Sequence, residues 1–324
     1  MRRRLIAVSV VSLLLFGSAA CGGDGTDDDS AAGSASDSSS GEPIDGLTVE
    51  GEVGESVEVS MEAPLAKGTA SQVITEGDGN PLKLNETFLL HLYIGNATSG
   101  DDAISTYDQE VPIQVVASED QLFKAVLDEI VGQPRGTRLA ITAPVKDVWG
   151  PQGAPQLELK ASDEAVFVAD IVSVQPTEVI DGPEGTDVEP PADAPTVIEE
   201  DGKVTGLDFS EAPKKAPKDL TVIPLVEGDG PVAEPESMVT FNYYGAVWGE
   251  AKPFDESYSR EPAPFGVGVN GLIGAWDKEI PGLKRGSRVL IIAPADEAYG
   301  DQEQPDIPAG STLTFVVDVL GVDE

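Results

Sequence analysis

An internal repeat constrains the fold of this 324-residue chain more than any other feature of its sequence. Residues 132–138 and 282–288 carry glycine and arginine at the same spacing, 150 positions apart. Four further pairs of segments match in the same order at nearly the same offset: 75–79 with 226–230, 93–95 with 243–245, 149–152 with 299–302, and 167–170 with 315–318. Ordered matches of this kind predict two copies of one domain, at residues 46–178 and 205–324.

The segment between the two copies has a different composition. Residues 179–204 contain four prolines among glutamates and aspartates. Proline stiffens such a segment and like charges extend it, which predicts a linker that holds the two domains apart. Residues 205–210 are expected to form a lead-in strand of the second domain, with residues 57–61 as its counterpart in the first.

Within the second copy, the apolar residues predict mostly β-structure. Runs rich in β-branched residues, or alternating between apolar and polar side chains, indicate strands. These runs are residues 220–227, 239–244, 289–292 and 313–320.

One helix is expected, over residues 271–280. Leu272, Trp276 and Ile280 recur at helical spacing and form one apolar stripe, and Gly282 marks the end of the helix. A short helix packed against an antiparallel sheet is an α+β fold.

The N-terminus has the pattern of a targeting segment. Arginines at positions 2–4 precede an apolar run, residues 5–16, that is too short to span a bilayer permanently. Small residues 17–20 then lead to Cys21, which resembles the lipidation motif of bacterial lipoproteins, although Ser18 stands where that motif has an aliphatic residue. We expect a signal peptide at residues 1–20 and lipid on Cys21, anchoring the protein at the outer face of the cytoplasmic membrane; the alternative is an ordinary secretory signal. Residues 21–45, rich in Ser, Asp and Gly, predict a disordered tether.

Charge and rare residues exclude several classes of function. The chain has 58 acidic and 20 basic residues, a formal charge of −38, which repels phosphate backbones and argues against nucleic acid as a partner. With His91 as the only histidine and Cys21 as the only cysteine, neither a structural zinc site nor an intrachain disulfide is expected. The sequence predicts no cofactor.

A candidate site lies between residues 254 and 300. Aromatic residues make up only 6% of the chain, yet here Phe254, Trp276 and Tyr299 recur, with the acid Asp255 directly after Phe254. This set predicts a small apolar pocket with a polar handle. The alternative is that the aromatic residues are core and that Asp255 forms a turn.

The motifs of the second copy, in order, resemble the FKBP-type peptidyl-prolyl cis/trans isomerases, the macrolide-binding immunophilins. The resemblance covers residues 218–324, and more weakly the first copy. It rests on segments 241–245, 254–257, 265–268, 272–276, 286–288, 298–300, 307–308 and 313–315. The whole chain thus resembles an actinobacterial lipoprotein with two tandem FKBP-like domains, each a curved antiparallel sheet wrapped on one short helix.

The resemblance also implies the site. Trp276 would be the floor of the pocket, Asp255 and the Tyr299 hydroxyl its polar handles, and the Ile273 N–H would face the ligand. The walls would be Tyr243, Phe254, Ile273 and Phe315, with Ile307 on a loop above. Proline-containing polypeptides would be the clients and macrolides would be inhibitors. Ala263 departs from the family, where a wall phenylalanine is frequent, and so does the acidic loop 301–306; both departures bear on substrate preference.

The first copy is expected to be degenerate. At the offset of 150, Val126 takes the position of Trp276 and Trp149 that of Tyr299, and residues 107–108 are the candidate counterpart of residues 254–255. Two hypotheses follow for the protein: an isomerase assisting the folding of secreted or envelope proteins, or a non-catalytic, lipid-anchored chaperone or protein-binding module.

Overall fold

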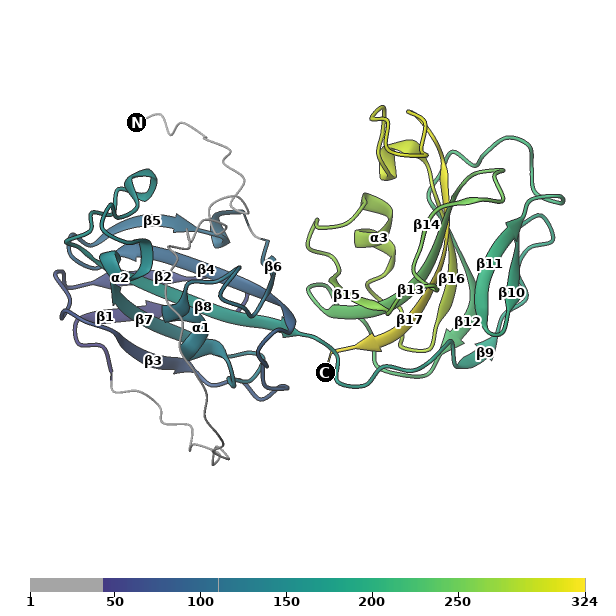
Figure 1. Cartoon of the computed structure of the whole chain (residues 1–324). Coiled ribbons are helices and arrows are strands. Elements are labelled where there is room, and N and C mark those ends of the chain that lie inside the picture. Colours follow the sequence, from purple (N-terminus) through teal and green to yellow (C-terminus); the bar gives the residue numbers. More distant parts are fainter. Residues whose placement is uncertain (1–42, 110, 324) are drawn as a thin grey trace, which may run out of the picture. The chain divides into compact units, whose positions relative to one another are not determined.

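The computed structural model describes residues 43–109 and 111–323 and divides the chain into two compact units (Figure 1). One unit is built mainly from residues up to 172 and the other mainly from residue 173 onwards. The predicted signal peptide, Cys21 and nearly all of the predicted tether lie outside the described residues. No helix in the described ranges is long and apolar enough to cross a membrane.

The second unit contains a seven-stranded antiparallel sheet in the order β14-β13-β17-β16-β12-β9, with β15 also paired to β13. The four strands expected in this copy are all present. The strands are β9 (Gly185–Asp187), β12 (Thr221–Gly228), β13 (Met238–Val247), β14 (Pro253–Glu256), β15 (Ala263–Gly266), β16 (Arg288–Ala293) and β17 (Leu313–Val322).

Helix α3 (Gly274–Glu279) covers one face of this sheet, and η4 (Ala295–Glu297) follows β16 (Figure 1). The helix begins later than the expected residue 271, because Ile273 is extended, with ψ of 149°, and accepts the first helical hydrogen bonds on its carbonyl. Ala275 and Trp276 are buried against strand residues such as Phe241 and Phe315. Gly282, with φ of 93°, takes the left-handed conformation that ends the helical segment.

The opposite face of the sheet is covered by a hairpin, β10 (Thr196–Glu200) with β11 (Lys203–Asp208) (Figure 1). Val204 and Leu207 of the hairpin pack against Leu290 and Val316 of the sheet. Strand β11 corresponds to the expected lead-in strand.

Residues 179–204 differ from the linker that their composition predicts. Strand β9 pairs with β12, and β10 pairs with β11, so both strands belong to the second unit. Their composition is misleading because the segment has few apolar residues, and because β12, the partner of β9, and most of β11, the partner of β10, lie outside it.

The first unit repeats this plan. Its six-stranded sheet has the order β3-β7-β8-β4-β5, with β6 paired to β4, and a separate hairpin joins β1 and β2. The strands are β1 (Leu47–Glu50), β2 (Glu58–Met61), β3 (Ala70–Thr75), β4 (Thr87–Asn96), β5 (Asp101–Ser105), β6 (Ile113–Val116), β7 (Arg138–Pro144) and β8 (Glu164–Val174). The helical segments are η2 (Tyr107–Gln109), α1 (Lys124–Ile130), α2 (Val145–Trp149) and η3 (Pro155–Leu157).

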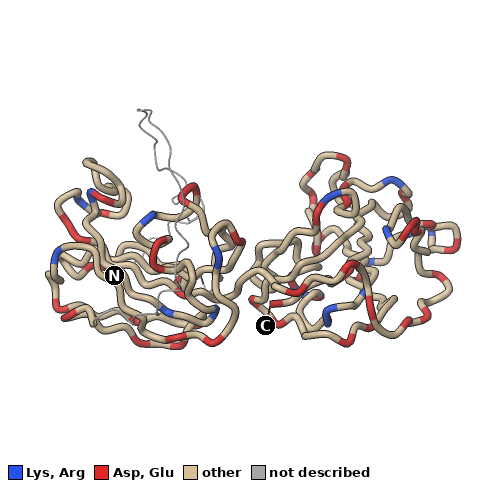
Figure 2. The backbone as a smooth tube through the Cα atoms, turned by 60° about the horizontal axis from the view of Figure 1, so that its bottom comes forward, with Lys and Arg blue, Asp and Glu red and all other residues tan. Residues whose placement is uncertain are grey.

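The fold class is α+β, as the sequence predicts. Helix α1 buries Val126, Leu127 and Ile130, and the β1–β2 hairpin packs on the outer face of the sheet through residues such as Val59. Acidic side chains outnumber basic ones along the backbone of both units (Figure 2).

Candidate active site

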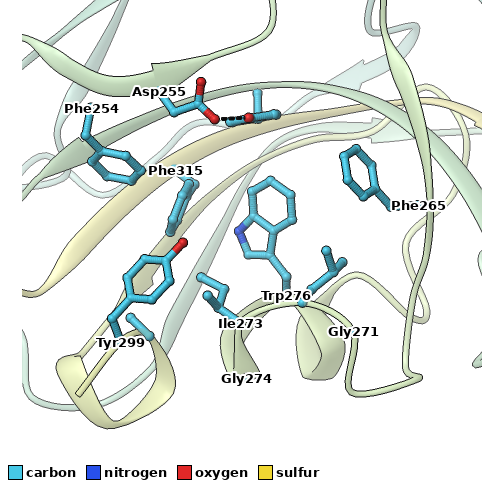
Figure 3. Close-up of a pocket in the computed structure, with 12 residues that line it drawn as sticks. Phe254, Asp255, Phe265, Gly271, Ile273, Gly274, Trp276, Tyr299 and Phe315 are labelled. Atoms are coloured by element: carbon cyan, nitrogen blue, oxygen red, sulfur yellow. Dashed lines mark hydrogen bonds between the residues drawn. The ribbon is translucent and has the colours of Figure 1, made fainter. Parts of the chain in front are cut away.

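A cavity of about 490 Å³ opens between α3 and the sheet of the second unit (Figure 3). Its side chains come from strands β13, β14, β15 and β17, from helix α3 and its lead-in, and from the segment after η4. The lining residues are Tyr243, Phe254, Asp255, Phe265, Gly271, Leu272, Ile273, Gly274, Trp276, Ala298, Tyr299 and Phe315.

The structure brings together seven of the eight site residues expected from the sequence: Tyr243, Phe254, Asp255, Ile273, Trp276, Tyr299 and Phe315. Ile307 differs from the expectation. It does not line the cavity and is only 5% exposed, as part of the core that also contains Leu313. Backbone hydrogen bonds between Gln304 and Ile307 close a short turn, which accompanies this inward position.

Trp276 forms the floor of the cavity. Its indole makes edge contacts with Phe241, Tyr243 and Phe315, at ring-centroid distances of 4.9, 5.3 and 5.2 Å. The side chain is only 6% exposed, and its buried Nε1 has no hydrogen-bond partner among the described residues. Burying a hydrogen-bond donor without an acceptor costs free energy, and an acceptor supplied by a ligand lowers that cost.

Asp255 lies at the rim of the cavity, where its side chain is 49% exposed. Its oxygens accept a hydrogen bond from the Tyr243 hydroxyl and one from Arg260 Nη2, the latter at 2.9 Å. The backbone N–H of Glu256 donates to the same carboxylate at 2.9 Å. With these donors Asp255 is a fixed negative charge rather than a free acceptor.

The Tyr243 hydroxyl is held in its protonated form. Burial, followed by the hydrogen bond to Asp255, raises the pKa of Tyr243 to about 12. The hydroxyl therefore remains a donor to Asp255 throughout the physiological pH range.

Two donors at the cavity remain unused within the described chain. The backbone N–H of Ile273, just before the first turn of α3, donates no hydrogen bond to any described group. The hydroxyl of Tyr299 likewise donates none to the described residues. In Figure 3 the Tyr299 hydroxyl points inward, towards the other lining residues. These donors could hold one or two carbonyl oxygens of a polypeptide.

Aspartate 277 fixes the segment that leads into α3. Its carboxylate accepts the backbone N–H groups of Gly268, at 2.9 Å, and Leu272, at 3.0 Å. On the same helix, Lys278 pairs with Glu297 of η4 at 2.5 Å. The first contact holds the residue before Ile273, and the second joins α3 to the segment that precedes Tyr299.

Sequence reasoning missed Phe265 and Arg260 as site residues. Phe265 lines the cavity and stacks on Phe241 at 5.1 Å, whereas Ala263, two residues earlier on the same strand, is exposed. Phe265 therefore supplies an aromatic wall from β15. The signal that could have indicated Phe265 is its position in an FKBP-like motif. No sequence pattern indicated Arg260, which reaches Asp255 only through the fold of the loop 257–262.

Hydrogen bonds show that strands β13 and β4 of the two copies align at a different offset from the 150 that the sequence suggests. In the second copy Tyr243 N–H donates to Ser257 Oγ at 2.8 Å; in the first, Leu92 N–H donates to Thr106 Oγ1 at 2.9 Å. Leu92 thus corresponds to Tyr243, at an offset of 151. Because Tyr93 is shifted by one residue, its side chain belongs to the opposite face of the sheet.

The same register corrects the expected counterpart of residues 254–255. Asp255 pairs with Gly245, and Ile104 pairs with Ile94, so Ile104 takes the position of Asp255. Tyr107 instead corresponds to Tyr258, because each hydroxyl lies beside a buried arginine–aspartate pair.

In the first copy, aromatic side chains fill the space that is open in the second. Trp149, at the position of Tyr299, stacks on Phe167 at 5.8 Å and contacts Phe123 at 4.9 Å. Val126 replaces the tryptophan floor and is fully buried. The first copy has thus lost the floor, the Tyr–Asp pair and the unused tyrosine hydroxyl.

Within the described ranges, no group of three or more His, Cys, Asp or Glu side chains could hold a metal ion. The chemistry available to the cavity is therefore that of an apolar floor, a fixed carboxylate and hydrogen-bond donors.

Comparison with known proteins identifies relatives of the second copy. The sequence model of the FKBP-type peptidyl-prolyl cis-trans isomerases matches residues 230–320, which include every residue lining the cavity. The chain is 38% identical over 109 residues to an FK506-binding protein of Streptomyces anulatus, covering 33% of this chain and 88% of the relative. It is 40% identical over 111 residues to FK506-binding protein 1 of Debaryomyces hansenii, covering 33% of this chain and 98% of the relative.

A third relative is the FKBP-type peptidyl-prolyl cis-trans isomerase FkpA of Escherichia coli. It is 33% identical over 129 residues, which cover 38% of this chain and 47% of FkpA.

Proposed function

Because the chain belongs to the family of FKBP-type peptidyl-prolyl cis-trans isomerases, we propose that the cavity around Trp276 isomerises Xaa-Pro bonds of secreted or envelope polypeptides. The observation that carries the proposal is the position of an unpaired, buried indole beneath an open apolar cavity with two unused donors at its edge. The proline ring packs on such an apolar floor, and a carbonyl of the same polypeptide can accept from the indole N–H.

The physical chemistry of the amide explains how such a cavity accelerates the reaction. Resonance makes the peptide bond planar and gives it a rotation barrier of about 18–20 kcal/mol. An Xaa-Pro bond populates both isomers but exchanges only over tens to hundreds of seconds. Twisting the bond removes the resonance and much of the charge separation, so an apolar site stabilises the twisted bond relative to the planar one.

Each polar group has a defined part in this mechanism. The Ile273 N–H donates to a carbonyl of the bound polypeptide, and the Tyr299 hydroxyl donates to a second one. Asp255, held by Tyr243 and Arg260, contributes a fixed field at the rim rather than a proton. No general base takes part.

The test is the rate of cis/trans exchange of an Xaa-Pro peptide, measured by a protease-coupled assay with the intact chain. We expect a rate above the uncatalysed one, and a lower rate for Asp255→Val, which releases Tyr243 and Arg260. A folded wild-type protein that leaves the exchange rate unchanged contradicts the proposal.

Macrolides are a second class of ligand for the same cavity. Two relatives are named for binding FK506, and here the aromatic walls include Phe265 even though Ala263 departs from the family pattern. We expect FK506 to inhibit the peptide exchange and to change the fluorescence of Trp276. Inhibition without any effect of Trp276→Leu on FK506 affinity counts against this site.

The proposed location of the protein in the cell rests on Cys21 and not on the cavity. We propose that Cys21 carries lipid and that the chain acts at the outer face of the cytoplasmic membrane, on clients emerging there. Radiolabelled palmitate should enter the wild-type chain and not Cys21→Ser. Equal labelling of the two proteins contradicts the anchor.

A non-catalytic role fits the first copy better. Trp149 contacts Phe123 and Phe167 on its inner face, and it lacks the tyrosine hydroxyl that Tyr299 supplies in the second copy. We assign it to chaperone-like binding or spacing at the membrane rather than to catalysis.

A further inference from the structure

Both copies bury an arginine–aspartate pair on the face of the sheet opposite the helix. Arg138 and Asp170 lie on neighbouring strands of the first unit and are 1% and 0% exposed. Arg288 and Asp318 are their equivalents in the second unit, at 5% and 1% exposure. In each pair the guanidinium bonds the carboxylate through two nitrogen atoms.

In the first copy a turn of the chain covers this pair. The loop between β1 and β2, residues 51–57, bends over Arg138. The guanidinium donates to the backbone carbonyls of Glu50, Gly51, Glu52 and Ser56, at distances between 2.8 and 3.3 Å. The N–H of Gly54 in return donates to Asp170 at 2.8 Å. The buried pair is therefore satisfied by the backbone of one polypeptide turn.

In the second copy the corresponding turn is too short to do this. Only residues 201–202 separate β10 from β11. Among the described residues the guanidinium of Arg288 interacts only with side chains, those of Asp318, Glu199 and Tyr258. These three partners do not use all five of its N–H groups, and no described backbone carbonyl accepts from it, in contrast to the four carbonyls around Arg138.

The position of the missing turn is a cavity of about 590 Å³. Arg288, Tyr258 and Asn242 come from the sheet side, and the hairpin turn and residues 181–187 form the walls. All of these residues belong to the second unit, and none of them lines the cavity above Trp276.

We propose that this outer cavity binds a turn or extended segment of another polypeptide, whose backbone carbonyls accept from the N–H groups of Arg288 that its three side-chain partners leave unused. The first copy supplies the pattern: the same arginine–aspartate pair is completed there by four carbonyls and one N–H. Buried donors without acceptors are costly, and an incoming peptide backbone removes that cost.

The charges around the cavity restrict the occupant. Asp181, Asp187, Glu199 and Asp201 outnumber Lys203 and Arg288 among the lining residues. An acidic segment is repelled, whereas a neutral, glycine-containing backbone offers carbonyls without added negative charge. The occupant is therefore a neutral polypeptide segment that needs no proline, which separates this site from the one that holds Xaa-Pro bonds.

The test uses a capped peptide that copies residues 50–56 with each glutamate replaced by glutamine: Gln-Gly-Gln-Val-Gly-Gln-Ser. It is titrated into the intact chain while NMR follows the side-chain resonances of Arg288 and Asn242. We expect saturable shifts at these residues and none at the Trp276 indole.

A matched pair of variants locates the binding. Gly182 lines the cavity, has no positive φ, and a Cβ there meets nothing within 4 Å, so Gly182→Trp adds a large ring at the cavity wall without a clash at its Cβ. Ser210→Trp adds the same ring at an exposed position outside the cavity. We expect Gly182→Trp to weaken peptide binding at least about tenfold and Ser210→Trp to leave it within about twofold.

Three outcomes overturn the proposal: no saturable shifts, shifts at Trp276 instead of Arg288, or equal affinities for Gly182→Trp and wild type. None of them depends on isomerase activity, which is measured separately with the Xaa-Pro peptide.

Discussion

At the residue scale, the second copy differs from the first at the positions that give its cavity a floor and polar groups. Trp276, Tyr299, Tyr243 and Asp255 stand where the first copy has Val126, Trp149, Leu92 and Ile104. The first copy folds to the same plan without them. These four side chains are therefore not required for the fold, which favours a functional role for them in the cavity.

Removing the Tyr299 hydroxyl tests one donor. Tyr299 is 38% exposed and its hydroxyl has no partner in the described chain, so Tyr299→Phe should leave the stability unchanged. The loss of one hydrogen bond to the reacting polypeptide costs about 1 kcal/mol, which lowers kcat/KM about fivefold. Steady-state kinetics with the Xaa-Pro peptide measure this, and an unchanged kcat/KM contradicts the assignment.

The pKa of Tyr243 gives a pH-dependent prediction. Because its folded value of about 12 lies above the ordinary 10.0, the hydrogen bond to Asp255 stabilises the fold fully below pH 10. That stabilisation is lost as the pH rises through 12. The difference in unfolding free energy between wild type and Tyr243→Phe should be constant below pH 10 and shrink above it. Urea unfolding at several pH values measures it; a difference that shrinks below pH 9, roughly one unit under the ordinary value, argues against a protonated donor.

Most lining residues could be predicted from the sequence because they sit in short, ordered motifs around Trp276. Asp255 was placed correctly in the cavity, but its exposure was not foreseen, since it depends on Arg260 and on the loop between them. Ile307 does not line the cavity in the structure but packs in the core cluster that also contains Trp276, a position that its short motif did not indicate.

At the element scale, a substitution that releases the segment leading into α3 is the most direct way to disturb the site. Asp277 holds the N–H groups of Gly268 and Leu272, and Asp277→Ala leaves both without this acceptor. We expect a loss of about 1–3 kcal/mol in the free energy of unfolding, together with a drop in kcat/KM, because Leu272 and Ile273 line the cavity.

Asp219→Ala is the matched control for that variant. Asp219 is an exposed acid away from the cavity, so its removal should change neither quantity by much. Chemical denaturation and peptide-exchange kinetics measure the two effects. Equal behaviour of Asp277→Ala and Asp219→Ala contradicts a positioning role for Asp277.

Strands of the second copy were predictable because their apolar alternation is local. The short strands β9 and β10 were not, because neither has a strong apolar pattern, and β9 in addition pairs with the distant strand β12. The counterpart of Asp255 was also missed, because one extra residue shifts the register of β13 relative to β4, and a shift of one residue moves each side chain to the other face.

At the scale of the whole molecule, duplication has produced one domain with an open inner cavity and one with a filled inner cavity. The outer face shows the reverse pattern, since the first copy fills the space over its arginine and the second leaves it open. The second unit thus carries both open sites. Catalysis by the intact chain should depend on that unit alone.

The most direct test of this account is the cis/trans exchange rate of an Xaa-Pro peptide, measured by exchange NMR with the intact chain and two variants. Trp276→Leu removes the floor of the second copy, and Trp149→Leu changes the corresponding aromatic region of the first. We predict catalysis by wild type, a loss of at least about tenfold for Trp276→Leu, and a rate within about twofold of wild type for Trp149→Leu. A folded Trp276→Leu protein that retains the wild-type rate would contradict the account.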